Sequence, residues 1–115
     1  MKKEEYELQA MVNKYCLYKN IYFCCINNNQ VPAMINGVYN REFAIKQAVK
    51  QKKIGLKKGV ADSFIIYNNQ VIFIEFKTIK GKQSEEQKDF ENICKNNNIK
   101  YYVIHSFDEF LNIFN

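Results

Sequence analysis

Two apolar runs separated by a pair of asparagines constrain the fold of this chain more than any other feature of its sequence. Residues 63–67 read SFIIY, and residues 70–78 read QVIFIEFKT. Both runs are rich in β-branched and aromatic residues, a composition typical of β-strands. Asparagine tolerates a positive φ angle, so Asn68 and Asn69 suit a two-residue hairpin turn. The sequence therefore predicts a tight β-hairpin.

The second strand of this hairpin carries charged side chains inside an apolar run. Side chains alternate between the two faces of a strand, so Glu75 and Lys77 are neighbours on one face. If the two asparagines form the turn, strand pairing places Asp62 opposite Glu75. Two carboxylates and an ammonium group would then meet at one end of the hairpin. Because a buried, unpaired carboxylate is costly and close carboxylates repel each other, some partner must compensate them.

A divalent cation is one such partner, since Mg²⁺ binds few carboxylates and keeps water and phosphate oxygens as its other ligands. The alternative is a buried ion pair between Glu75 and Lys77, with a solvated Asp62. A Glu-x-Lys triplet alone decides little, and the chain contains a second one, residues 86–88, at the polar start of an expected helix. What indicates a site is the combination of an acid after a glycine turn, a tight hairpin, and an acid-x-lysine triplet inside an apolar strand.

The segments before the hairpin predict helices around one more strand. Apolar residues recur at helical spacing over residues 2–19, and residues 21–26 (IYFCCI) are expected to form a short buried strand. Residues 31–40, which contain the only proline, are expected to form a loop. Asn40 can cap a second helix, for which Gly55 is a stop signal.

The segments after the hairpin predict a helix, a strand and a short last helix. Ser84 with Gln87, and Ser106 with Glu109, fit capping boxes that begin the two helices, and residues 99–105 form an apolar strand between them. The last strand follows a helical crossover, so it should be parallel to a neighbour. The order is α-β-α-β-β-α-β-α, an α/β fold with a mixed four-stranded sheet flanked by helices.

Composition and charge limit what kind of protein this can be. The 115 residues, of which 47% are hydrophobic, suffice for a single domain with a core over residues 1–115. No apolar run approaches the roughly 18–20 residues of a membrane span, and the first residues are charged, so we expect no membrane partner and a cytoplasmic location. The four cysteines form no CxxC pair, which argues against a structural zinc.

The formal charge of +5 is concentrated in one stretch before Asp62. A basic stretch is often only a solvated face, but one that leads into a candidate metal site suits contact with a phosphate backbone. The candidate DNA-binding residues are Lys50, Lys52, Lys53, Lys57, Lys58, Lys80 and Lys82.

Four stretches of the chain resemble one family of nucleases. These are EYELQ at residues 5–9, GLKKGVAD at residues 55–62, IEFKTIKGKQSEEQ at residues 74–87, and the closing strand and helix. In this order they resemble the VRR-NUC (virus-type replication-repair nuclease) family of the PD-(D/E)XK nuclease superfamily. The resemblance implies a restriction-endonuclease-like core.

The resemblance also implies roles for particular residues. Asp62 and Glu75 would bind the metal together with the backbone carbonyl of Phe76, and Lys77 would orient the attacking water. Gln87 would complete the site from the crossover helix.

Two further positions bear on the resemblance. Glu5 would approach the site from the first helix, and Ala61 stands where the family usually has proline. Loss of that proline loosens the turn without removing a ligand.

The activity implied is that of a DNA endonuclease that uses Mg²⁺, with Mn²⁺ able to substitute. It would be structure-selective for branched or four-way-junction DNA, in the replication, recombination or repair of a phage or mobile element in a bacterial cell. A chain this short would act as a homodimer with two matched sites. The competing hypothesis is a non-catalytic DNA-binding or interaction module that keeps the nuclease fold.

Overall fold

Over the residues that the structure describes, the protein has an α/β architecture with a mixed four-stranded sheet and four α-helices, as the sequence predicts. A computed structural model describes residues 1–26 and 34–115, so part of the predicted loop 31–40 lies outside the described residues. The chain divides into two compact units, a larger one of residues 1–26 with 59–115 and a smaller one of residues 27–58. The sequence pattern did not indicate this division.

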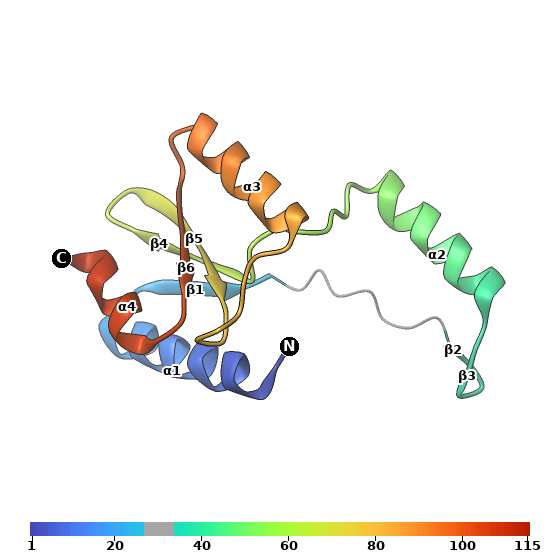
Figure 1. Ribbon diagram of the computed structural model, residues 1–115, viewed down its shortest axis with the longest axis horizontal. Coiled ribbons are helices and arrows are strands. Elements are labelled where there is room, and N and C mark those ends of the chain that lie inside the picture. The colour runs from blue at the N-terminus through green and yellow to red at the C-terminus, as the bar shows by residue number, and fades with distance from the viewer. Residues whose placement is uncertain (27–33) are drawn as a thin grey trace. The chain divides into compact units, whose positions relative to one another are not determined.

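The larger unit contains the four-stranded sheet (Figure 1). Its strand order is β1-β4-β5-β6, with β1, β4 and β5 antiparallel in turn and β6 parallel to β5. The prediction of a last strand parallel to its neighbour is therefore confirmed. The elements are α1 (Lys3–Lys19), β1 (Tyr22–Cys25), β4 (Ser63–Tyr67), β5 (Gln70–Phe76), α3 (Glu85–Asn96), β6 (Lys100–Ile104), α4 (Phe107–Leu111) and a 3₁₀ turn η1 (Asn112–Phe114).

The β4–β5 hairpin forms as predicted. Asn68 and Asn69 both have positive φ angles, 54° and 63°, as a two-residue turn with the twist of the flanking strands requires. The pairing begins with Tyr67 opposite Gln70 and continues without a bulge. The turn therefore sets the register of both strands, and with it the face on which each side chain lies.

The two faces of the sheet are covered by different helices, with α1 and α4 on one side and α3 on the other (Figure 1). On the first face, Ile74 and Phe76 of β5 pack in the core with residues of α1 and α4, among them Val12 and Phe110. On the second, the ring of Phe73 meets that of Phe90 in α3, with 5.1 Å between centroids. Because Glu75 alternates with Ile74 and Phe76, it belongs to the α3 face.

The two predicted capping boxes differ in the structure. Ser84 and Gln87 form a complete box: the backbone N–H of Gln87 donates to Ser84 Oγ at 3.2 Å, and the Ser84 N–H donates to Gln87 Oε1 at 2.8 Å. Ser106 accepts from the Glu109 N–H, but the Glu109 carboxylate accepts instead from the backbone N–H of His105, at 2.7 Å. The second box is therefore only half formed, because the carboxylate reaches one residue further back.

The smaller unit corrects one prediction. Where a loop was expected, β2 (Met34–Ile35) and β3 (Val38–Tyr39) form an antiparallel hairpin. Its turn is Asn36-Gly37, with both residues at positive φ. An Asn-Gly pair is a strong hairpin signal, but the flanking strands of two residues each are too short to show an alternating pattern.

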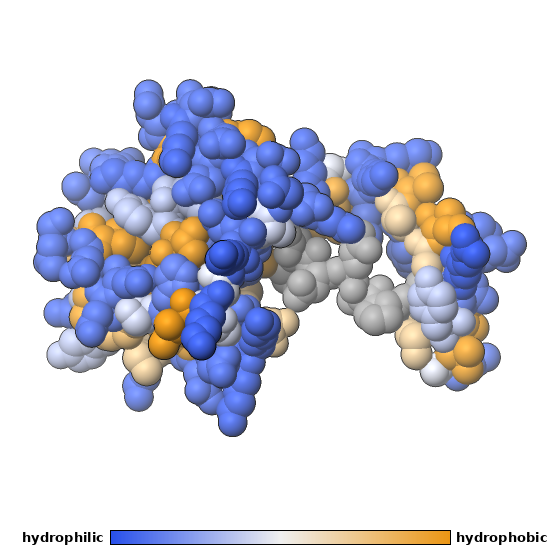
Figure 2. Space-filling model, viewed as in Figure 1, coloured by the Kyte–Doolittle hydropathy of each residue, from blue (hydrophilic) through white to orange (hydrophobic). Residues whose placement is uncertain are grey.

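The helix of the smaller unit, α2 (Arg41–Lys53), forms as predicted. The Asn40 side chain accepts from the Phe43 N–H, and Gly55 follows the helix with a φ of 87°. None of the described residues of this unit is buried, and apolar side chains lie exposed along α2 (Figure 2).

Candidate functional site

Glu75 is the most unusual residue of the larger unit. It is the next-to-last residue of β5, and its side chain is 1% exposed. Its Oε1 atom has no hydrogen-bond partner among the described residues. A buried polar atom without a partner lowers the free energy of unfolding, so a structural role alone does not account for this carboxyl group.

Asp62 lies beside Glu75 at the end of the hairpin. The β4–β5 ladder ends with Ser63 opposite Ile74, and the same register continued by one step places Asp62 opposite Glu75, as predicted. Beyond the last backbone pair, the side chain of Asp62 forms the next hydrogen bond between the two segments: its Oδ2 accepts from the Phe76 N–H at 2.9 Å. This bond fixes one carboxylate at the mouth of the hairpin, next to the other.

The electrostatics of Glu75 involve three of the other predicted site residues. Burial raises the pKa of Glu75 to about 10, and a hydrogen bond with Asp62 and the negative charges of Asp62 and Glu5 act in the same direction. Lys77 acts in the opposite direction. Without a cation, Glu75 therefore keeps its proton at neutral pH. A positive ion at this point would favour the ionised form of Glu75.

The backbone carbonyl of Phe76 faces the β4 side of β5, the side on which Asp62 lies. Along β5, the Ile74 carbonyl accepts from Ser63 Oγ on the β4 side, whereas the Lys77 N–H donates to Ile104 on the β6 side. The N–H and C=O of one strand residue point to the same neighbour. Since the Phe76 N–H is bound to Asp62, its carbonyl also faces the β4 side.

The other predicted site residues are placed less directly. Glu5, in the first turn of α1, is partly buried and acts on Glu75 electrostatically. Gln87 is partly buried at the start of α3, with its carboxamide oxygen held in the helix cap. The site role of Gln87 stays a prediction.

The candidate DNA-binding lysines are divided between the two units. All seven are exposed. Two lie in the larger unit, between β5 and α3, and five in the smaller unit, in the last turns of α2 or just after it. These are Lys80 and Lys82 in the larger unit, and Lys50, Lys52, Lys53, Lys57 and Lys58 in the smaller one.

One residue near the site, Tyr101, was not predicted from the sequence. Tyr101 of β6 is partly buried, and its hydroxyl accepts a hydrogen bond from Gln83 Nε2 at 3.2 Å. Burial raises the pKa of Tyr101, and the charges of Glu75, Glu91 and Asp62 add to the effect. The sequence alone does not distinguish Tyr101 from an aromatic residue of the core, because its position depends on how β6 pairs with β5.

Gly59 brings the segment before Asp62 close to α3. It has a φ of 87°, and a Cβ atom there would collide with the backbone of Glu86 in the first turn of α3. Only glycine satisfies both conditions. This contact joins the start of the crossover helix to the segment before β4 that carries the first carboxylate.

Within residues 1–26 and 34–115, no group of three or more histidine, cysteine, aspartate or glutamate side chains is arranged to hold a metal ion. The predicted ligand set contains two side chains and a backbone carbonyl. None of the helices in these same ranges is long and apolar enough to cross a membrane.

Comparisons with known proteins find no match: no family model fits the chain, and no curated protein and no solved structure is significantly similar to it. The family resemblance therefore rests on the sequence motifs, and the site on the geometry of the larger unit.

Proposed function

We propose that the chain is a divalent-metal-dependent endonuclease that hydrolyses phosphodiester bonds in DNA. The observation that carries the proposal is Glu75, a carboxyl group at 1% exposure with an oxygen that has no partner among the described residues, beside a second carboxyl group. Pairs of this kind are costly to the fold, and strongly perturbed carboxyl groups concentrate at functional sites. A cation would provide the missing interaction.

The residues present fit Mg²⁺ in number and in chemistry. Asp62, Glu75 and the Phe76 carbonyl would supply hard oxygen ligands, few enough to leave positions for water and phosphate oxygens. Mn²⁺ accepts the same ligands and should substitute. The bound cation would neutralise charge on the phosphate and make water a better nucleophile.

The protein's own side chains would perform the remaining tasks. Lys77 directly follows β5 and acts electrostatically on Glu75. Its ammonium group would orient the attacking water and stabilise the charge that develops on the phosphate. The water oxygen joins phosphorus as the bond to the 3′ oxygen breaks, and the 3′ oxygen receives a proton. The products would be a 5′-phosphate and a 3′-hydroxyl, as the family resemblance implies.

The resemblance supplies the finer parts of the proposal. It favours a restriction-endonuclease-like core of the VRR-NUC family, and a homodimer that acts on branched or four-way-junction DNA in replication, recombination or repair. Exposed lysines of both units would contact phosphates without selecting a base sequence. Such contacts predict binding that weakens steeply with added salt.

A panel of substrates and metals tests the proposal. Linear, nicked, flapped and four-way DNA would be incubated with the purified chain in Mg²⁺, Mn²⁺, Ca²⁺ or EDTA. We expect nicking of branched substrates in Mg²⁺ and Mn²⁺ and none in EDTA. Salt-sensitive binding of DNA without cleavage in either metal would contradict the proposal and favour the non-catalytic module.

A further inference from the structure

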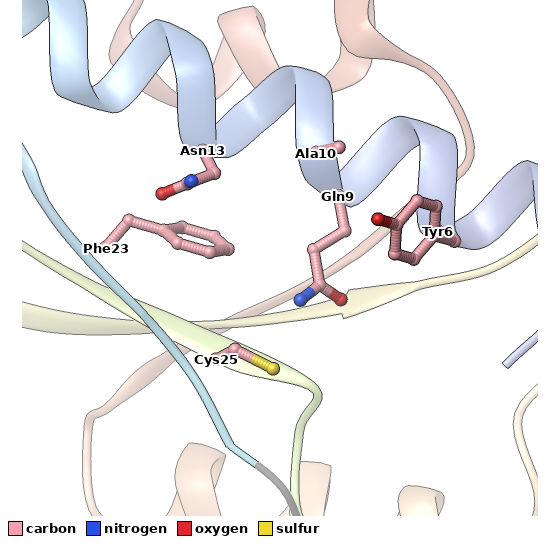
Figure 3. Close-up of a pocket in the computed structure, with 6 residues that line it drawn as sticks. All are labelled: Tyr6, Gln9, Ala10, Asn13, Phe23 and Cys25. Atoms are coloured by element: carbon pink, nitrogen blue, oxygen red, sulfur yellow. The ribbon is translucent and has the colours of Figure 1, made fainter.

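The larger unit contains a pocket between α1 and the edge strand β1 (Figure 3). Its volume is about 220 Å³. The helix side chains reach down toward those of the strand, which face them from below (Figure 3). The lining residues are Tyr6, Gln9, Ala10 and Asn13 of α1 and Phe23 and Cys25 of β1.

One polar atom of this pocket lacks a partner among the described residues. The Oε1 atom of Gln9 is buried, and no described residue forms a hydrogen bond with it. Asn13 places a second carboxamide one helical turn further on. A buried carboxamide oxygen without a partner destabilises a fold, so its presence points to a ligand that donates to it. Carboxamides can pair with the donor and acceptor edge of a nucleobase.

The remaining lining suits a flat ring. Tyr6 is 66% exposed at the rim, and Phe23 is partly buried in the floor. Aromatic side chains of this kind stack on bases of any sequence. The volume of about 220 Å³ is smaller than the roughly 300–1,000 Å³ of pockets for drug-sized ligands, which favours a single heterocycle.

The pocket lies at the same end of the sheet as the candidate site. Gln9 follows Glu5, which acts on Glu75, by four residues, so the two residues are separated by about 6 Å along the helix axis. On the opposite wall, Cys25 pairs with Ser63, the residue after Asp62. The pocket and the carboxyl groups therefore lie at the same end of the sheet, the pocket on the α1 face and Glu75 on the α3 face, so a strand bound at both would pass around the end of β4 and β5.

We propose that this pocket receives an unpaired nucleobase from the DNA strand whose phosphate lies at Asp62 and Glu75. This inference rests on the proposed function and narrows it. A base inside a duplex is paired and stacked, so it cannot enter the pocket without leaving the helix. The preferred substrate is therefore DNA with unpaired nucleotides next to the cut, such as a flap, a gap or an open junction.

A binding experiment tests the pocket without cleavage. Fluorescence anisotropy in Ca²⁺ would compare a labelled single-stranded oligonucleotide with a blunt duplex of the same sequence. Gln9→Met keeps the length of the side chain and removes its hydrogen-bonding groups, and Asn92→Leu changes an exposed amide on α3 as the matched control. We expect Gln9→Met to weaken single-strand binding about tenfold and to leave duplex binding unchanged.

The melting temperature separates this role from a structural one. Because the Gln9 amide has an unpartnered buried atom, Gln9→Met should melt no lower than the wild type. Equal losses on both DNA forms, or a loss that occurs together with a lower melting temperature, would overturn the proposal. So would an equal effect of Asn92→Leu.

An abasic scan locates the base that enters. Flap substrates would carry one abasic nucleotide at successive positions around the cut. We expect a single position to slow cleavage about tenfold in the wild type, and no position to do so in Gln9→Met. A flat profile in a wild type that cleaves would overturn the pocket and leave the nuclease proposal standing. If the wild type never cleaves but binds single strands through Gln9, the nuclease proposal would be overturned and base binding by the pocket would stand.

Discussion

The chain contains two Glu-x-Lys triplets in very different surroundings. Glu75 lies in β5 at 1% exposure and Lys77 directly follows that strand, whereas Glu86 and Lys88 lie in the first turn of α3, where both are exposed. Lys88 pairs with Glu85 at 3.6 Å, a solvent-screened ion pair of little energetic value. Identical spacing therefore gives a buried, charged face in one place and an ordinary helix surface in the other.

Secondary structure accounts for the difference. Residues at i and i+2 share a face on a strand, but on a helix they point in different directions. At the end of β5 the spacing brings the ammonium group of Lys77 within electrostatic reach of the Glu75 carboxyl group, and the hairpin register adds Asp62. The triplet in α3 has no such third partner imposed by strand pairing. The Glu-x-Lys triplet is a candidate site only where a strand and its pairing bring these groups together. The triplet in α3 supplies matched control variants for the tests below.

The largest difference between the triplets should be catalytic. Glu75→Gln, Lys77→Ala and Asp62→Asn are each expected to slow cleavage of branched DNA by at least about 100-fold, because each removes charge that acts on the phosphate or the cation. Glu86→Gln and Lys88→Ala should cleave at the wild-type rate. Gel assays of initial rates in Mg²⁺ would measure this. Undiminished cleavage by Lys77→Ala would refute its role in orienting water.

The second difference should appear in stability without metal. Glu75→Gln keeps a hydrogen-bond donor for Asp62 and cannot ionise, so it should raise the free energy of unfolding by about 1–3 kcal/mol at neutral pH. In EDTA this corresponds to roughly 4–8 °C of melting temperature for each kcal/mol in a domain near this size. Glu86→Gln should change little, because its side chain is exposed.

The advantage of Glu75→Gln should grow with pH. In the folded protein the pKa of Glu75 is raised to about 10, against an ordinary value of 4.5. Between these values the unfolded chain has released a proton that the folded chain retains, so the stability of the wild type falls as pH rises. Glu75→Gln cannot ionise, so its free energy of unfolding does not fall with pH for this reason. Thermal melts from pH 5 to about 9 would measure the gap, and a constant gap would contradict a buried, protonated Glu75.

Part of this comparison could be predicted from the sequence, and part could not. The Asn68-Asn69 turn and period-two alternation determine the hairpin register locally, so the approach of Asp62 to Glu75 could be inferred before the structure. The same reasoning missed the β2–β3 hairpin, because its two-residue strands are too short to alternate visibly.

Features that depend on distant packing could not be predicted. The position of Tyr101 follows from the parallel register of β5 and β6, which a whole crossover helix separates in the chain. The Gln9 pocket depends on how α1 packs against β1, and periodicity carries no information on such a gap. Turns and helix caps depend on a few neighbouring residues and can be predicted from them. Cavities and the register of strands joined by a crossover depend on how the whole core packs.

The third difference should be metal-dependent stability. A cation that binds only the folded protein adds about 1.4 kcal/mol at ten times its dissociation constant. Wild type and Glu86→Gln should therefore melt higher in Mg²⁺ than in EDTA, and Glu75→Gln should not. Calorimetric titration with Mn²⁺ would measure the same contrast directly. An equal rise in all three proteins would place the binding away from Glu75.

The smallest difference concerns Gln87, the central residue of the control triplet and a predicted site residue. Gln87→Ala removes the hydrogen bond to the Ser84 N–H and should cost about 0.5–1 kcal/mol. Gln87→Glu keeps the capping box and places a negative charge at a helix N-terminus, so its melting temperature should stay close to that of the wild type. If the carboxamide also serves the site, Gln87→Glu should cleave several-fold more slowly despite its intact fold. Wild-type cleavage by Gln87→Glu, with a loss in Gln87→Ala that only follows its lower stability, would restrict Gln87 to capping α3. The two carboxyl groups and the lysine at the open end of the β4–β5 hairpin would then be the distinctive part of the comparison.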